Sequence, residues 1–147
     1  MKALIQRVSC ASVKADGMLA GEIGTGILVF LGIAENDGMD EITYIADKIA
    51  NLRIFEDNDC KMNLSLLDIK GEILIISQFT LYGSCVKGRR PSFTDAAGPA
   101  KAGPVYNDFI EYISKKYDIK VCTGVFAAHM DVELINSGPV TLMIESR

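Results

Sequence analysis

The sequence lacks the patterns that define several protein classes. Its four cysteines are far apart and form no C-x-x-C pair: Cys10, Cys60, Cys85 and Cys122. We therefore expect neither a zinc site nor a disulfide framework, but the reduced thiols of a cytoplasmic protein. There is no run of 18 apolar residues, and the N-terminus has no uninterrupted apolar stretch before Gln6. The sequence thus predicts no membrane span, signal peptide or membrane partner.

The usual catalytic and cofactor-binding patterns are also missing. His129 is the only histidine, and no Cys or Asp stands at the spacing of a triad or a metal site. There is no G-x-S-x-G motif, and the acidic turn at 56–61 lacks the ligand spacing of an EF-hand. We therefore expect no metal and no cofactor, and interpret His129 as a solvated loop residue.

The sequence has fewer basic than acidic residues. The chain has 15 Lys and Arg against 19 Asp and Glu, a net charge of −4. Affinity for a nucleic-acid backbone comes from cations on phosphates, so this balance argues against a protein that tracks along DNA or RNA. It leaves open an enzyme that binds one terminal nucleotide. With 147 residues, 49% of them hydrophobic, the sequence predicts a single globular domain over 1–147.

Hydrophobic periodicity predicts a mixed α/β fold. The strands are expected at 2–15, 18–23, 27–33, 72–83, 120–124, 131–136 and 140–145. Asp16-Gly17 is typical of a two-residue hairpin turn. One amphipathic helix is expected after Asp37 or Asp40 as N-cap, and a second at 105–117, its start flanked by Pro99 and Pro104.

The strand predicted at 72–83, E-I-L-I-I-S-Q-F-T-L-Y-G, changes character halfway. Its first half is apolar at both parities, so both faces should be covered by protein. Ser77, Gln78 and Thr80 then follow without a turn residue. A continued strand would place Gln78 and Thr80 on the face opposite Ser77 and Phe79. Three hydrogen-bonding side chains at the end of a buried strand are either paired core groups or a site.

Three further features have two interpretations each. Arg7 shares the parity of Ile5 and should be half buried, either covering apolar surface or holding a nearby backbone loop. The cations Lys87, Arg89 and Arg90 in the loop 83–98 are either solvated or positioned to meet RNA phosphates. Gly138-Pro139 interrupts a strand, for which a trans edge bulge is the ordinary explanation.

The amino-acid sequence of these stretches resembles that of the D-aminoacyl-tRNA deacylase family. The resemblance lies in S-Q-F-T-L-Y-G, K-G-R-R-P-S-F, N-S-G-P-V-T, the opening K-A-L-I-Q-R-V-S-C-A-S-V and A-D-K-I-A-N-L-R-I-F-E-D. It spans nearly the whole chain. It implies an α/β fold of antiparallel and mixed sheets forming a barrel-like layer with two main helices packed on it, dimerised through the sheet.

The resemblance also implies an activity and partners. The family is an editing hydrolase that cleaves the ester bond of D-aminoacyl-tRNA, and glycyl-tRNA on a wrong tRNA is a further expected target. The alternatives that the residues leave open are a non-enzymatic dimer that binds tRNA ends or nucleotides, and a small-molecule esterase. The expected partners are aminoacylated tRNA and a second copy of the chain, but not DNA.

Site residues are implied in four groups. The catalytic group is Ser77, Gln78, Phe79 and Thr80. From the residues themselves we expect backbone N–H groups at this strand end to serve as oxyanion hole and the Gln78 amide to hold the substrate. The resemblance implies that the 2′-hydroxyl of the terminal ribose takes part, so Thr80 is expected to position substrate first and to act as nucleophile second. Chiral selection is implied for a cis Gly138-Pro139 inserted into the partner's site and held by Arg7. The terminal adenosine is expected on Phe126 and Met130, with core packing as the alternative. The phosphates are expected on Lys87, Arg89 and Arg90.

Overall fold

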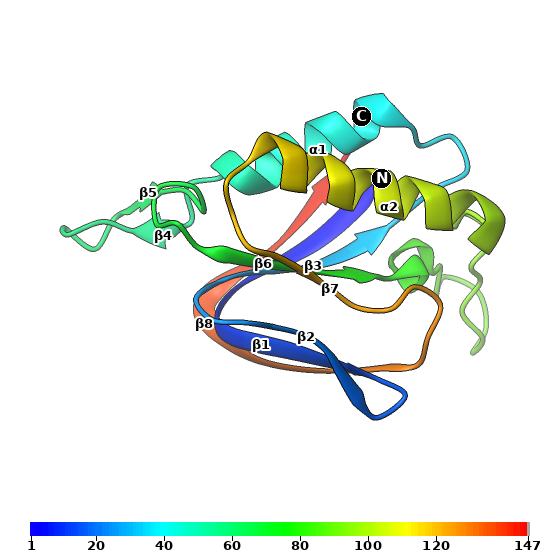
Figure 1. Cartoon of the computed structure of the whole chain (residues 1–147). Helices are drawn as coiled ribbons and strands as arrows, with labels where there is room; N and C mark the ends of the chain where they lie inside the picture. Colours follow the sequence, from blue (N-terminus) through cyan, green and yellow to red (C-terminus); the bar gives the residue numbers. More distant parts are fainter. Residues whose placement is uncertain (147) are drawn as a thin grey trace.

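A computed structural model describes residues 1–146, which form one curled sheet under two helices (Figure 1). The sheet contains β1 (Lys2–Ala15), β2 (Met18–Ile23), β3 (Gly26–Gly32), β6 (Glu72–Ser77), β7 (Val121–Thr123) and β8 (Met130–Glu145). The remaining elements are α1 (Met39–Asn51), the hairpin β4 (Phe55–Glu56) and β5 (Met62–Leu64), the 3-10 helix η1 (Phe79–Tyr82) and α2 (Pro99–Lys116). Within the described part of the chain, neither helix has the length and apolar character needed to cross a membrane.

The first strand, β1, organises the sheet. Its first half pairs antiparallel with β3, its second half with β2, and its other edge with β8 along most of its length. The sheet continues through the parallel pairs β3–β6 and β6–β7. It then curls until β2 meets β7, where a Cβ on Gly21 would lie 2.8 Å from the carbonyl oxygen of Thr123. The predicted barrel-like layer under two helices is therefore confirmed.

Two apolar cores explain why β6 is hydrophobic on both faces. Ile73 and Ile75 face the helices and pack in one buried cluster with residues of α1 and α2 such as Ile45 and Phe109. Leu74 and Ile76 face the inside of the curled sheet and belong to a second cluster. Figure 1 shows α1 and α2 side by side over one face of the sheet, and the curl of β1, β2 and β8 on the other side. Both faces of this strand are covered, as predicted.

Both predicted helix starts are wrong. The N-cap of α1 is Gly38, whose N–H donates to the Glu41 carboxylate at 2.9 Å. Asp37 is occupied elsewhere, because its carboxylate pairs with the α-ammonium group of Met1 at 2.7 Å. The second helix, α2, begins at Pro99, and Pro104 lies inside it. A proline there removes only one helical hydrogen bond, close to the helix start.

The strand predictions need two corrections, whereas the hairpin is confirmed. Asp16 and Gly17 both adopt positive φ, 49° and 82°, as a tight hairpin turn requires. The two strands predicted at 131–136 and 140–145 are a single strand, β8, with an irregular register. The strand predicted at 72–83 ends at Ser77, because the chain turns into η1.

A carboxylate, Asp47, joins the two helices. It accepts hydrogen bonds from the Lys116 ammonium (2.8 Å), the Tyr117 hydroxyl (2.7 Å) and the Tyr112 hydroxyl (3.1 Å). Burial raises the pKa of Asp47, but these three donors together outweigh it, so its pKa lies below the ordinary 3.8. The cluster therefore stabilises the fold above the unfolded-state pKa, and the stabilisation is lost as the pH falls through the lowered value.

We expect Asp47→Asn to lower the melting temperature at pH 7 by a few degrees, which corresponds to about 1 kcal/mol for a paired carboxylate. At pH 3 the difference from wild type should shrink, because this pH lies below the ordinary pKa of 3.8, so the carboxylate of the unfolded wild-type chain binds protons and unfolding is favoured. Thermal unfolding followed by circular dichroism at both pH values measures this. Glu111→Gln removes the charge of an exposed intrahelical pair and is the control. A difference that stays the same at pH 3 would contradict the assigned role.

Candidate active site

A cavity of about 590 Å³ opens at the C-terminal end of β6. Its lining includes Ser77, the last residue of β6, then Gln78, and Phe79 at the start of η1. The opposite walls come from the loop before α2, the first turn of α2, and the segment that leads into β8. Three of the four residues predicted as catalytic thus line one cavity, whose walls are mostly apolar. Thr80 lies next to it on η1 and is exposed.

The change from strand to 3-10 helix leaves backbone donors free beside this cavity. The N–H of Gln78 still donates to the carbonyl of Leu31 at 2.8 Å, as in a strand. The turn bonds of η1 then begin with the N–H of Leu81. Within residues 1–146, the N–H groups of Phe79 and Thr80 donate no hydrogen bond to another residue. Two unpaired adjacent N–H groups are what an oxyanion hole requires.

Within residues 1–146, the side chain of Thr80 has one hydrogen-bond partner. The Gln78 amide donates to its Oγ1 at 2.5 Å. Among the described residues, no histidine or carboxylate makes a hydrogen bond with this hydroxyl. A hydroxyl without an adjacent base is a poor nucleophile, so this geometry favours positioning by Thr80.

The two residues predicted to hold the adenosine form one wall of the cavity. Phe126 packs against Tyr106, with ring centroids 5.8 Å apart, and contacts α2 at Gly103. Tyr106 is fixed by donating to the carbonyl of Ile75 at 2.7 Å, and its burial raises its pKa. Met130 and Phe126 are both half buried. They therefore pack on the core and also present surface to the cavity, so the two interpretations are compatible.

Two residues that line the cavity and carry an aromatic or ionisable side chain were not predicted as site residues. His129 lines the cavity and is exposed at its rim, and its Nε2 lies 3.7 Å from Oδ1 of Asp131. Phe93 also lines it and packs edge-on against Phe79, with centroids 5.2 Å apart. Phe93 closes the motif K-G-R-R-P-S-F, which is the signal that pointed to it. For His129, only its position beside Met130 was such a signal.

The basic loop adjoins the cavity through Phe93. Ser84 and Ser92 exchange two backbone hydrogen bonds, of 2.8 and 2.9 Å, and so close the loop into a narrow projection. Lys87, Arg89 and Arg90 are exposed along it. The structure therefore places three cations on an arm that begins next to the candidate site.

The residues predicted for chiral selection lie elsewhere in the chain. Gly138 and Arg7 line a different cavity, of about 570 Å³, beside β4. Pairing of β1 with β8 jumps from Gln6↔Thr141 to Val8↔Asn136, so residues 137–140 bulge out opposite Arg7. We call these four residues the selector segment. Its Gly138–Pro139 peptide bond is cis, as the resemblance implies.

The side chain of Arg7 replaces the missing ladder bonds. Its Nε donates to the carbonyl of Ser137 at 3.0 Å, and its Nη2 donates to the carbonyl of Gly138 at 2.8 Å. Its Nη1 donates to the carbonyl of Ile54, at the start of the β4–β5 hairpin. Arg7 is only 5% exposed, so the expectation that it is half buried is wrong. The three carbonyl contacts allow the guanidinium to be buried, and the interpretation that it holds a backbone loop fits.

The described residues of the two cavities do not form a cluster of metal ligands. Among residues 1–146, no three His, Cys, Asp or Glu side chains gather closely enough to hold an ion. The candidate active site is instead an apolar cavity with backbone donors at one end.

Comparison with known proteins agrees with this architecture. The sequence profile of the family described as "D-Tyr-tRNA(Tyr) deacylase" matches residues 4–145. The "D-aminoacyl-tRNA deacylase" of Thermosipho melanesiensis is 56% identical over 147 residues, covering 100% of this chain and 98% of the relative. The protein of the same name from Fervidobacterium nodosum is 55% identical over the same shares.

A solved structure shares the fold closely. It is titled "c-Myc DNA Unwinding Element Binding Protein", is 42% identical, and superposes with a TM-score of 0.94 over 100% of this chain and 99% of its own. The curled mixed sheet under two helices is thus shared with a protein that is 42% identical, and the family match assigns the chain to a deacylase class. The chain belongs to the D-Tyr-tRNA(Tyr) deacylase family.

Proposed function

We propose that the cavity at the end of β6 hydrolyses the ester bond of D-aminoacyl-tRNA. The observation that carries this proposal is the pair of free N–H groups, on Phe79 and Thr80, beside an apolar cavity, where no histidine or carboxylate of residues 1–146 is hydrogen-bonded to the Thr80 hydroxyl. Ester hydrolysis needs an oxyanion to be stabilised where water is largely excluded. Family membership over residues 4–145 supplies the substrate class.

In the proposed hydrolysis, no side chain acts as nucleophile or base. Water adds to the ester carbonyl, the oxyanion is held by the Phe79 and Thr80 N–H groups, and the ribose 3′-oxygen leaves with a proton. We infer that the neighbouring 2′-hydroxyl of the terminal ribose assists, because Thr80 has no base beside it. Gln78 and Thr80, hydrogen-bonded to one another, position the substrate. Ser77 marks the last strand residue, from which this turn starts.

Selection against L-amino acids requires a second subunit. The selector segment does not line the cavity of its own chain, so it is available to enter the cavity of a partner. In the partner's cavity, the carbonyls of Gly138 and Pro139 would face the α-carbon of the bound aminoacyl group. They would collide with the side chain of an L residue but not with a hydrogen at that position. Arg7 uses only one lone pair of the Gly138 carbonyl oxygen, so that oxygen can still face the substrate. D residues direct their side chains away, and glycine, which has none, passes. Discrimination then comes from rejection, which predicts tolerance of many D side chains.

The dimer should form through the sheet. The edge strand β8 carries exposed apolar side chains on both sides of the selector segment: Ile135 is 61% exposed and Met143 is 47% exposed. Covering these side chains with a second copy would bury apolar surface and bring the selector segment to the partner.

The tRNA end is held in two places in this proposal. Phe126 and Met130 offer an aromatic face and a thioether for the terminal adenine. Lys87, Arg89 and Arg90 meet phosphates from the arm beside the cavity. Only a short stretch of RNA is then bound, which is compatible with a net charge of −4.

The direct test is hydrolysis of matched D-, L- and glycyl-tRNAs by the purified protein. We expect D-aminoacyl-tRNA and glycyl-tRNA to be cleaved and L-aminoacyl-tRNA to persist. Binding of uncharged tRNA without cleavage of any ester would instead identify a binding protein. Cleavage of small-molecule esters with equal efficiency would identify a general esterase.

The role of Thr80 is tested with a paired change in enzyme and substrate. We expect Thr80→Ala to slow deacylation by only about tenfold, because it removes a positioning hydroxyl and spares both free N–H groups. A tRNA ending in 2′-deoxyadenosine should hardly be cleaved by wild type. Single-turnover rates measure both. If Thr80→Ala is inactive and the deoxy substrate is cleaved normally, Thr80 is the nucleophile.

A further inference from the structure

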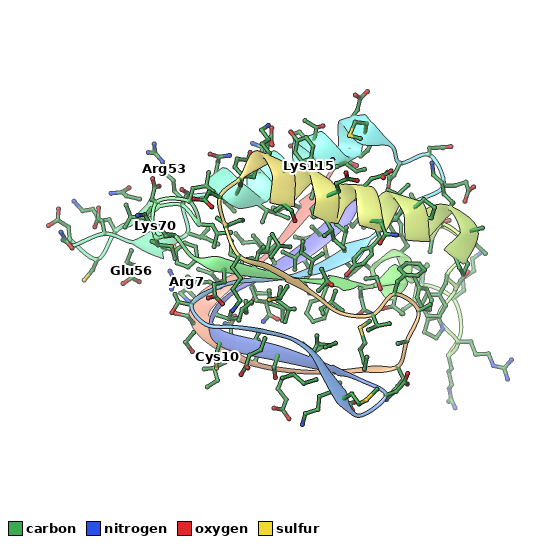
Figure 2. The ribbon with its side chains drawn as sticks, in the orientation of Figure 1. Arg7, Cys10, Arg53, Glu56, Lys70 and Lys115 are labelled. Carbon is green, nitrogen blue, oxygen red and sulfur yellow. The ribbon has the colours of Figure 1, made fainter. Side chains whose placement is uncertain are left out.

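Among residues 1–146, Glu56 is the only residue whose carboxylate lies within 4.0 Å of the Arg7 guanidinium. The Oε1 atom of Glu56, on β4, lies 3.8 Å from its Nη2, the same nitrogen that donates to Gly138. Figure 2 shows Arg7 and Glu56 at the end of the sheet where β4 and β5 project. Glu56 and Gly138 also line the same cavity. One nitrogen thus connects a charged side chain of the hairpin to the selector segment.

The two sides of this connection differ in how firmly they are held. On the β4 side, Ile54 and Phe55 are 5% and 6% exposed and are packed in the main core. On the other side, Gly138 and Pro139 are exposed, and residues 137–140 have no ladder partner on β1. The hairpin is therefore the fixed reference, and Arg7 transmits its position to the selector segment.

We propose that Glu56 is a positioning residue for chiral selection and acts through Arg7. The Ile54 carbonyl fixes Nη1, and the charge of Glu56 keeps Nη2 between the hairpin and the Gly138 carbonyl. Without that charge, the Ile54 carbonyl would be the one contact left on the hairpin side among the described residues, and Nη2 would be held less firmly at the Gly138 carbonyl. This inference rests on the proposed function, because it assigns the contact to the discrimination between D- and L-substrates.

The contact has a signature that packing alone does not have. The side chain of Glu56 is 52% exposed, so its attraction for Arg7 is screened by salt, whereas the three short bonds to carbonyls are much less affected. At saturating enzyme, all of the tRNA is bound, so the ratio of D to L cleavage rates is independent of how tightly tRNA binds. A salt dependence of that ratio therefore reports on the position of the selector segment.

The test compares Glu56→Gln with wild type in single-turnover deacylation of D- and L-aminoacyl-tRNA at saturating enzyme. We expect the D/L rate ratio of the variant to fall about fivefold, the equivalent of about 1 kcal/mol for a partly exposed pair. We expect the wild-type ratio to fall as salt is raised from about 0.05 to 0.5 M, and the ratio of Glu56→Gln to stay constant.

Two controls separate this role from a general loss of charge or fold. Asp59→Asn removes a carboxylate from the same hairpin without touching Arg7 and should keep the wild-type ratio and its salt dependence. In an Arg7→Met background, Glu56→Gln should have no further effect, because the two residues act as one unit.

The outcomes also separate this inference from the proposed function. If wild type cleaves no D-aminoacyl-tRNA, the proposed function fails. If wild type discriminates D from L and Glu56→Gln does so equally well, with the same salt dependence, only the role of Glu56 is overturned.

Discussion

Replacing Arg7 by Lys should lower the ratio of kcat/KM for D- over L-aminoacyl-tRNA by about 100-fold, the loss expected when a positioned group moves by about 1 Å. The guanidinium holds Ser137, Gly138 and Ile54 with three separate N–H groups in one plane. An ammonium group keeps the charge and the burial but cannot reach three carbonyls in these directions. The selector segment would then lose its fixed position while the charge near Glu56 remains.

The effect on stability should be smaller than the effect on selectivity. The hydrogen bonds to the carbonyls of Ser137 and Gly138 are only partly buried, so water can replace Arg7 there when it is gone. Only the Ile54 carbonyl is deeply placed, so Arg7→Lys should cost about 1–3 kcal/mol of unfolding free energy. Urea unfolding measures this cost, and deacylation of paired D- and L-substrates measures selectivity.

A matched variant on the same strand provides the control. Lys14→Met removes a cation from β1 at an exposed position far along the strand from the selector segment, and should leave the ratio unchanged. A folded Arg7→Lys protein with the wild-type ratio would show that Arg7 does not position the selector segment.

Two inactive variants should restore activity when they are mixed. Gly98 lines the cavity, and a Cβ added there meets no neighbouring atom of residues 1–146 within 4 Å, so Gly98→Trp should fill the cavity without disturbing the fold. Gly138 is similarly open, its Cβ nearing only the Asn136 amide at 3.9 Å. Gly138→Phe should therefore project a ring from the selector segment into the cavity of the partner.

The arithmetic of mixed dimers decides whether the sites are shared. In a mixed dimer, the cavity of the Gly138→Phe chain faces the unaltered selector segment of the Gly98→Trp chain, so one site in two works. Random exchange makes half of the dimers mixed, and about a quarter of the wild-type activity should return. If each site were complete within one chain, mixing would restore nothing.

The composition of the mixtures must be known for this test. Native mass spectrometry counts homodimers and mixed dimers, and deacylation of D-aminoacyl-tRNA is measured on the same samples. Activity that does not rise with the fraction of mixed dimers would contradict shared sites. An active wild-type monomer of 16.0 kDa in light scattering would do so as well.

The sequence by itself determined most of the elements, because their signals are local. The hairpin at Asp16-Gly17 follows from residues that tolerate positive φ, and the helical stripes of α1 and α2 follow from apolar spacing. The two-sided burial of β6 was readable from its unbroken apolar run. The motifs around Ser77 and Gly138 carried the family by resemblance, and the profile match over residues 4–145 bears this out.

Other features were decided only by tertiary structure. The strand β6 ends at Ser77, and its last ladder hydrogen bond runs from the Gln78 N–H to the carbonyl of Leu31. The chain then turns into η1 beside the cavity. No residue at 78–80 has a turn preference that would predict this change. Arg7 is buried because three carbonyls distant in sequence converge on it. His129 reaches the rim of the cavity because the segment before β8 is its far wall. In each case the deciding partner is distant in the chain, and local propensity contains no information about it.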